Sequence, residues 1–157
     1  MFEKNLTIMT DRKFKDKNEV ISYLANLNNQ NVIVPSDYEK DVLERESVVS
    51  TYVGFGVAIP HAKSLSLKSP FVIYGKIEEG VKWDESDEKV NQVFMIGVPK
   101  SENGQEKDSR LHLKILSELS KNLMRSSFRD ELIQAKNEEE VYKLLKTIEE
   151  GMNLWKS

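Results

Sequence analysis

The chain has 157 residues, of which 39% are hydrophobic and 31% are charged, with a net charge of -3. This length fits one globular domain, and the weak negative charge argues against a nucleic-acid-binding surface. We find neither a run of about 20 apolar residues that could span a membrane nor a secretory signal, so we expect a cytoplasmic protein. The absence of cysteine excludes disulfides and thiolate chemistry.

The first third of the chain predicts a short strand over residues 6–9 and a helix over residues 17–29. A second helix is expected from Ser36, because Ser36 and Glu39 have the spacing of a capping box. This helix ends near Glu46 and places Arg45 in its last turn. Its inward-facing side chains are expected to be Tyr38, Val42 and Leu43.

The middle of the chain predicts a sheet from apolar segments at residues 57–59, 71–77 and 93–98. The last segment is apolar with little alternation, which is typical of a central strand covered on both faces. Helices are expected from a cap at Asp108 or Ser109 to about Met124, and over 128–135 and 138–148. The sequence therefore predicts an α/β fold: a single-domain mixed sheet of about five strands with helices on both faces. We place the domain at residues 1–150 and a tail at 151–157.

Only two side chains, His61 and His112, titrate near neutral pH and can serve as nucleophiles. His61 follows a short apolar strand and Pro60, which cannot donate to a sheet, so we expect the ring at a strand end. His112 lies four residues before Leu116 on the apolar stripe of a predicted helix. Taken alone, a histidine such as the first more often caps a turn, and one such as the second is more often a hydrogen-bonded core residue.

The segment from Arg45-Glu46 through Ser50-Thr51 to Gly54–Ala62 resembles the phosphorylation-site signature of fructose- and mannitol-type enzyme IIA domains of the sugar phosphotransferase system. The resemblance continues downstream with Trp83-Asp84, Gly97-Val98-Pro99 and the residues around His112. Tyr52-Val53 and Ala62 depart from the pattern, where the family commonly has glycine.

The resemblance implies a phosphocarrier in which His61 accepts a phosphoryl group from phospho-HPr and donates it to a IIB component during sugar uptake. Arg45 would bind the phosphoryl oxygens, His112 would orient the ring or the phosphoryl group, and Ser50 and Thr51 would add donors. No metal or other cofactor is expected. The membrane would be reached only indirectly, through a IIC permease, and no IIB or IIC unit is expected on this chain.

Two other functions remain open from the sequence. A nitrogen-type regulatory IIA protein would use the same phosphohistidine to control partner binding. A metal-dependent hydrolase would need carboxylate ligands near both histidines, and the spacing does not supply them. Neither the sugar, the reactive nitrogen of His61 nor the oligomeric state can be deduced from the sequence.

Overall fold

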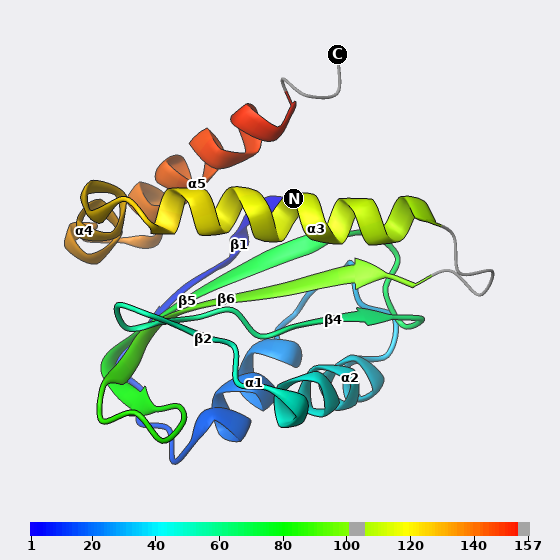
Figure 1. Cartoon of the computed structure of the whole chain (residues 1–157), viewed down its shortest axis with the longest axis horizontal. Helices are drawn as coiled ribbons and strands as arrows, with labels where there is room; N and C mark the ends of the chain where they lie inside the picture. The colour runs from blue at the N-terminus through cyan, green and yellow to red at the C-terminus, as the bar shows by residue number, and fades with distance from the viewer. Residues whose placement is uncertain (101–105, 154–157) are drawn as a thin grey trace.

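The structure is a computed structural model that describes the backbone of residues 1–100 and 106–153 and the side chains of residues 1–100 and 113–150. Within these residues it contains one six-stranded sheet and five helices (Figure 1). The strands are β1 (Phe2–Thr10), β2 (Tyr52–Gly54), β3 (Val57–Ala58), β4 (His61–Ser64), β5 (Phe71–Lys82) and β6 (Lys89–Pro99). The helices are α1 (Lys17–Ala25), α2 (Pro35–Val48), α3 (Glu106–Leu123), α4 (Ser126–Gln134) and α5 (Glu138–Asn153).

The sheet is mixed and follows the order β1-β5-β6-β3-β2, with β4 also paired to β6. β5 and β6 are antiparallel, whereas β1 runs parallel to β5 and both β3 and β4 run parallel to β6. The predicted mixed α/β fold is therefore confirmed, with six strands in place of about five. The division into a domain at 1–150 and a tail stays a prediction, and α5 continues to Asn153.

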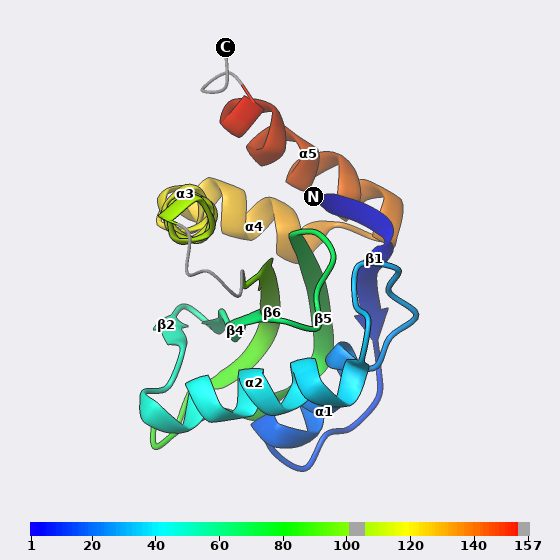
Figure 2. The same ribbon diagram turned by 90° about the vertical axis from the view of Figure 1, so that its right-hand side faces the viewer.

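Helices cover both faces of the sheet, as the sequence predicted (Figure 2). α1 and α2 lie on one face, and α3, α4 and α5 lie on the other. Successive residues of the central strands therefore enter different cores: Ile73 and Met95 pack in one cluster, while Tyr74 and Ile96 pack in the other. A strand that is apolar on both faces shows no alternation in its sequence, which is why the 93–98 segment had none.

Three predicted helix ends are wrong. α1 ends at Ala25, four residues early, because the Asn26 side chain donates to the Ser22 carbonyl oxygen at 2.8 Å and caps the helix. α2 begins at Pro35 with no side-chain cap, so the predicted capping box does not form. Proline suits the first helical position, since its fixed φ is already helical and no donor is needed there. α3 begins at Glu106, before the predicted cap at Asp108.

Candidate phosphoryl-transfer site

β3 and β4 pair with successive parts of the same edge of β6, and His61 lies directly after the gap between them. Ala58 is opposite Val93 and His61 is opposite Ile96. His61 is thus the first residue of β4: it lies at a strand end after the pairing of β3 has stopped, as predicted, but the pairing with β6 resumes at His61 itself, which was not predicted. Pro60 interrupts the pairing only locally, because its carbonyl oxygen still accepts from the Ile96 N–H at 3.0 Å.

Within the gap, Ile59 directs its backbone groups to partners outside β6. Its N–H donates to the Thr51 carbonyl oxygen at 3.0 Å. Its own carbonyl oxygen lies 2.8 Å from Nδ1 of His61. A carbonyl can only accept, so Nδ1 carries the proton and Nε2 of a neutral ring carries the lone pair. The backbone therefore selects one tautomer of His61.

The surroundings of His61 favour the neutral imidazole. The residue is 9% exposed. Burial lowers its pKa from the ordinary value of 6.5, and the nearby positive charge of Arg45 lowers it further. The hydrogen bond to Ile59 and the negative charge of Glu46 act in the opposite direction but do not cancel the shift. At neutral pH the ring is therefore uncharged and its lone pair is available.

Arg45 lies in the last turn of α2, as predicted. One of its guanidinium nitrogens, Nη1, donates to the Val49 carbonyl oxygen at 3.0 Å. A cation at this end of a helix also interacts favourably with the helix dipole. The side chain is half-buried and near enough for its charge to influence the pKa of His61. Its role in binding a phosphoryl group stays a prediction.

The hydroxyls of Ser50 and Thr51 are directed at carboxylates. Ser50 Oγ donates to Asp84 Oδ2 at 3.0 Å and accepts from the Tyr52 N–H at 3.2 Å. Thr51 Oγ1 donates to Glu46 Oε1 at 2.6 Å. Their predicted role as phosphoryl donors stays a prediction. His112 lies within α3, but its side chain is outside the described residues, so its predicted role is also untested.

Glu46 is a buried polar residue that the sequence analysis did not single out. It is 2% exposed, and its carboxylate accepts from the N–H of Thr51 and from the indole of Trp83. A signal for it was present in the sequence. Tyr38 and Val42 were predicted to face inward, and four residues further along the same helical stripe lies Glu46. A charged residue on an apolar stripe is uncommon unless it is paired.

The turn between β2 and β3 has three successive residues in the left-handed region: Gly54, Phe55 and Gly56, with φ of 94°, 59° and 75°. This conformation is strained for a bulky residue such as Phe55. The guanidinium carbon of Arg129 in α4 lies 3.8 Å from the centre of the Phe55 ring, a cation–π contact that joins the turn to the helices. The Arg129 guanidinium also donates to the Leu123 carbonyl oxygen at 2.5 Å.

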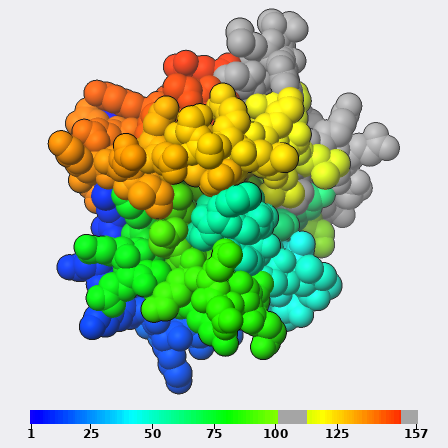
Figure 3. All heavy atoms as spheres, turned by 60° about the vertical axis from the view of Figure 1, so that its left-hand side comes forward, coloured from blue at the N-terminus to red at the C-terminus, as the bar shows by residue number. Residues whose placement is uncertain are grey.

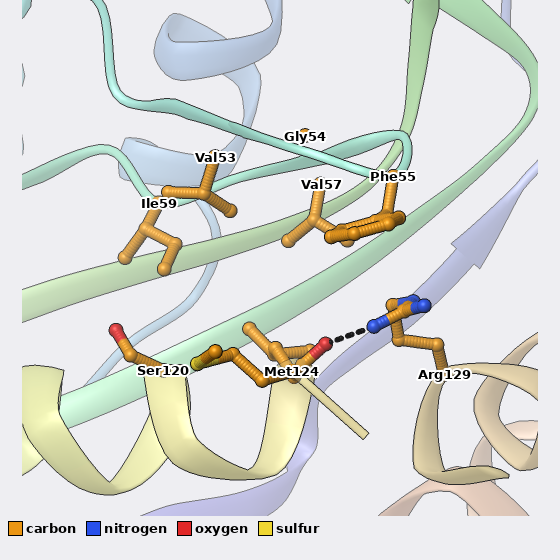
Figure 4. A pocket seen from close by; sticks show the side chains of 9 residues that line it. Val53, Gly54, Phe55, Val57, Ile59, Ser120, Met124 and Arg129 are labelled. Atoms are coloured by element: carbon orange, nitrogen blue, oxygen red, sulfur yellow. Dashed lines mark hydrogen bonds between the residues drawn. The ribbon is translucent and has the colours of Figure 1, made fainter. Parts of the chain in front are cut away.

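An apolar pocket of about 80 Å³ lies between this turn and helices α3 and α4 (Figure 4). Val53, Phe55 and Ile59 line it from the strand side, and Met124 lines it from the helix side. Three of these side chains are well exposed: Val53 at 49%, Phe55 at 65% and Met124 at 79%. In the space-filling view the turquoise segment that contains β2 and β3 forms part of the surface directly below the helices (Figure 3). One buried residue of the lining, Ile59, lies two residues before His61 and connects this exposed apolar surface to the histidine along the chain.

Two further features of the described residues bear on the class of site. No group of three or more histidine, aspartate or glutamate side chains in this part of the chain is placed to hold a metal ion. Among the helices described, none is both long enough and apolar enough to cross a membrane. The site thus consists of a histidine with a fixed tautomer, a nearby arginine and an adjoining apolar surface, an arrangement suited to group transfer between proteins.

Residues 1–148 match the family model for the phosphoenolpyruvate-dependent sugar phosphotransferase system, EIIA 2, and the chain belongs to this family. It is 32% identical over 142 residues to the multiphosphoryl transfer protein of Shigella flexneri, a match that covers 89% of this chain but 16% of that protein's length. It is 38% identical over 110 residues to the fructose-specific EIIA component of Haloferax volcanii, covering 69% of this chain and 68% of that one. The family resemblance drawn from the sequence is confirmed.

Solved structures share the fold. The nitrogen regulatory protein IIA-Ntr of Neisseria meningitidis superimposes with a TM-score of 0.77 at 26% identity, covering 92% of this chain and 95% of that one. The mannitol enzyme IIA of Escherichia coli, solved in complex with phosphorylated enzyme IIB, superimposes with a TM-score of 0.74 at 24% identity. That match covers 94% of this chain and 99% of the other.

Proposed function

We propose that this protein is a phosphocarrier of sugar uptake, in which His61 accepts a phosphoryl group from phospho-HPr and donates it to a IIB component. The observation that carries the proposal is the 2.8 Å contact between Nδ1 of His61 and the Ile59 carbonyl oxygen. It leaves Nε2 as the nucleophile on a ring that is neutral at physiological pH. Membership of the EIIA 2 family supports the same reaction class.

In the first step the Nε2 lone pair attacks the phosphorus of the donor phosphohistidine. A bond forms between Nε2 and phosphorus, the bond between phosphorus and the donor nitrogen breaks, and its electron pair stays on the donor ring. The His61 ring becomes positively charged, and the Nδ1 proton remains held by the Ile59 carbonyl. In the second step a IIB nucleophile attacks phosphorus, and the electron pair of the broken bond returns to Nε2.

Arg45 would stabilise the charge that spreads over the three equatorial phosphoryl oxygens during transfer. Its planar guanidinium can bind two oxygens at once, which a lysine ammonium cannot do in the same geometry. To do so it would exchange its present bond to the Val49 carbonyl oxygen for bonds to the phosphoryl group. That bond is exposed, and the exchange therefore costs little.

Protein donors and acceptors suit the surface around His61. Val53, Phe55 and Met124 expose apolar area next to the site, and such area is characteristic of protein–protein contacts. HPr and a IIB component would dock there in turn, in the cytoplasm, and a IIC permease would carry the sugar. Mannitol enzyme IIA, which shares this fold, is known in complex with its phosphorylated IIB.

The proposal is tested by the substitution His61→Ala. Incubation with phosphorylated HPr should give acid-labile phosphate on the wild-type protein and none on the variant, because the accepting nitrogen is gone. His112→Ala is the matched control, since it removes the other histidine of the chain, and it should still accept phosphate, although more slowly. Normal labelling of His61→Ala would refute the assignment.

A regulatory role is the second candidate, favoured by the likeness to the nitrogen regulatory protein IIA-Ntr. Such a protein would take up phosphate in the same way but would not need to pass it to a sugar-specific IIB. Purified IIB components of fructose and mannitol systems would be mixed with the phosphorylated protein. Rapid loss of phosphate to one of them supports transport, whereas retention by all of them supports regulation.

A further inference from the structure

The carboxylate of Glu46 is the meeting point of several donors beside the site. Oε2 accepts from the Thr51 N–H at 2.8 Å, from Trp83 Nε1 at 3.2 Å and from Lys17 Nζ at 3.5 Å. Oε1 accepts from Thr51 Oγ1 at 2.6 Å. Both carboxylate oxygens therefore accept hydrogen bonds, and each of them accepts one from Thr51. Donors from α1, from the loop between α2 and β2 and from the β5–β6 turn converge on one buried carboxylate.

A continuous series of hydrogen bonds runs from this carboxylate to the imidazole. Glu46 holds the N–H of Thr51, and the Thr51 carbonyl oxygen accepts from the Ile59 N–H at 3.0 Å. The Ile59 carbonyl oxygen then accepts from Nδ1 of His61 at 2.8 Å. Ile59 lies in the gap between β3 and β4, and its bond to Thr51 continues the register of Tyr52 opposite Ala58 by one residue, outside the pairing with β6. The position of the carbonyl that fixes the tautomer thus depends on Thr51.

We propose that Glu46 is a positioning residue: by holding Thr51 in place it sets the Ile59 carbonyl against His61 and thereby keeps the proton on Nδ1. Its importance for phosphoryl transfer rests on the proposed function, whereas its effect on the tautomer does not. Apart from the effect of its charge on the pKa of His61, Glu46 acts on the ring through two intervening residues, Thr51 and Ile59.

A carboxylate at position 46 suits a positioning role better than it suits a role in stability alone. Burying a charge is unfavourable unless donors surround it, and apolar residues of similar volume often stabilise a core equally well. A charged acceptor gives shorter and more directional bonds than a neutral one, as the 2.6 Å and 2.8 Å contacts to Thr51 illustrate. Such geometry matters where a displacement of about 1 Å costs roughly 10²-fold in rate.

The test compares Glu46→Ala with Glu46→Gln. Glutamine has the same shape, can accept from the Thr51 N–H with its oxygen and can donate to the Thr51 hydroxyl with its amide, so it should restore the geometry. ¹⁵N NMR of the two imidazole nitrogens of His61 reports the tautomer without any phosphoryl transfer. We expect Glu46→Ala to show a mixture of tautomers and roughly 10–100-fold slower phosphate uptake from phospho-HPr. Glu46→Gln should recover most of both.

Thr51→Val keeps the size of the side chain and the backbone N–H but removes the hydroxyl bond, and it serves if Glu46→Ala does not fold. We expect a partial shift of the tautomer and a rate loss of about tenfold, at the lower end of the range. Glu44→Gln, an exposed position on the same helix, is the matched control and should change neither readout. The rates are compared per folded molecule, with the melting temperature measured alongside.

A folded Glu46→Ala or Thr51→Val protein with the wild-type tautomer and rate would overturn the inference, even if its melting temperature fell. A disturbed tautomer in these variants supports it, whatever the wild-type protein does with phospho-HPr. Failure of the wild-type protein to accept phosphate would refute the proposed function alone, because the NMR readout is independent of that reaction.

Discussion

The β5–β6 hairpin and the segment from β2 to β4 are both β structure, but they are held together in different ways. β5 and β6 are 12 and 11 residues long, and their paired register extends from Phe71 opposite Gly97 to Lys82 opposite Lys89. The strands of the β2–β4 segment have 3, 2 and 4 residues, and a left-handed turn and a gap at Ile59 and Pro60 interrupt them.

This difference in pairing suggests that the hairpin mainly stabilises the fold, whereas the β2–β4 segment mainly positions the reactive histidine. Most residues of the hairpin are buried and they contribute to both cores, so changes there should alter the free energy of unfolding. In the β2–β4 segment the backbone groups around His61 are bound by one another and by a side chain of α2. Because the Ile59 carbonyl lies outside the pairing with β6, it can face a ring nitrogen, and changes there should alter phosphoryl transfer more than stability.

Among substitutions that separate transfer rate from stability, we expect Arg45→Ala to have the largest effect. Loss of one preorganised donor at a developing charge slows transfer by roughly 10²–10³-fold. The half-buried side chain makes one exposed bond, so the free energy of unfolding should change by less than about 1 kcal/mol. Rapid-quench kinetics of phosphoryl transfer from phospho-HPr measure the rate, and urea unfolding measures the free energy of unfolding.

Arg45→Lys and Lys40→Ala complete the experiment. The first keeps the charge but not the planar fork, and its rate should lie between those of the wild type and Arg45→Ala. The second removes an exposed cation from the same helix and should leave the rate unchanged. Transfer by Arg45→Ala at the wild-type rate would reject the proposed role of the arginine.

For Tyr74→Phe in the hairpin we expect a smaller effect, and on stability instead of on the rate of transfer. The buried Tyr74 hydroxyl donates to Gln92 Oε1 at 2.6 Å, and its loss leaves a buried acceptor without that donor. The free energy of unfolding should fall by roughly 1–3 kcal/mol. The rate of phosphate uptake per folded molecule should stay within about a factor of two of the wild type, since the substitution removes none of the hydrogen bonds that connect Thr51, Ile59 and His61. A large rate loss with unchanged stability would contradict the division between the two regions.

The sequence predicted the hairpin well and the β2–β4 segment poorly, for physical reasons. Apolar runs such as 93–98 carry their own signal, because burial on both faces is a property of the residues themselves. The bond between Ile59 and Thr51 joins positions eight apart through a strained turn, and no local pattern encodes it. The pairing of β4 was missed because Pro60 suggests a strand end, whereas the pairing with β6 resumes at the next residue, His61.

The site residues follow the same division. His61 and Arg45 could be singled out from a short motif and from the scarcity of titratable side chains. The role of Glu46 depends on what surrounds it in three dimensions, although its place on the stripe of Tyr38 and Val42 gave a hint that it is buried. The end of α1 was also set by one side chain, that of Asn26, which donates to the Ser22 carbonyl oxygen.

The most direct test of the account is to identify the nitrogen that carries phosphate. The ¹⁵N-labelled protein would be phosphorylated with phospho-HPr, and the coupling between ³¹P and the imidazole nitrogens of each histidine would be measured by NMR. We expect phosphate on Nε2 of His61, with the proton still on Nδ1. Phosphate on Nδ1 of His61, or on His112, would contradict it.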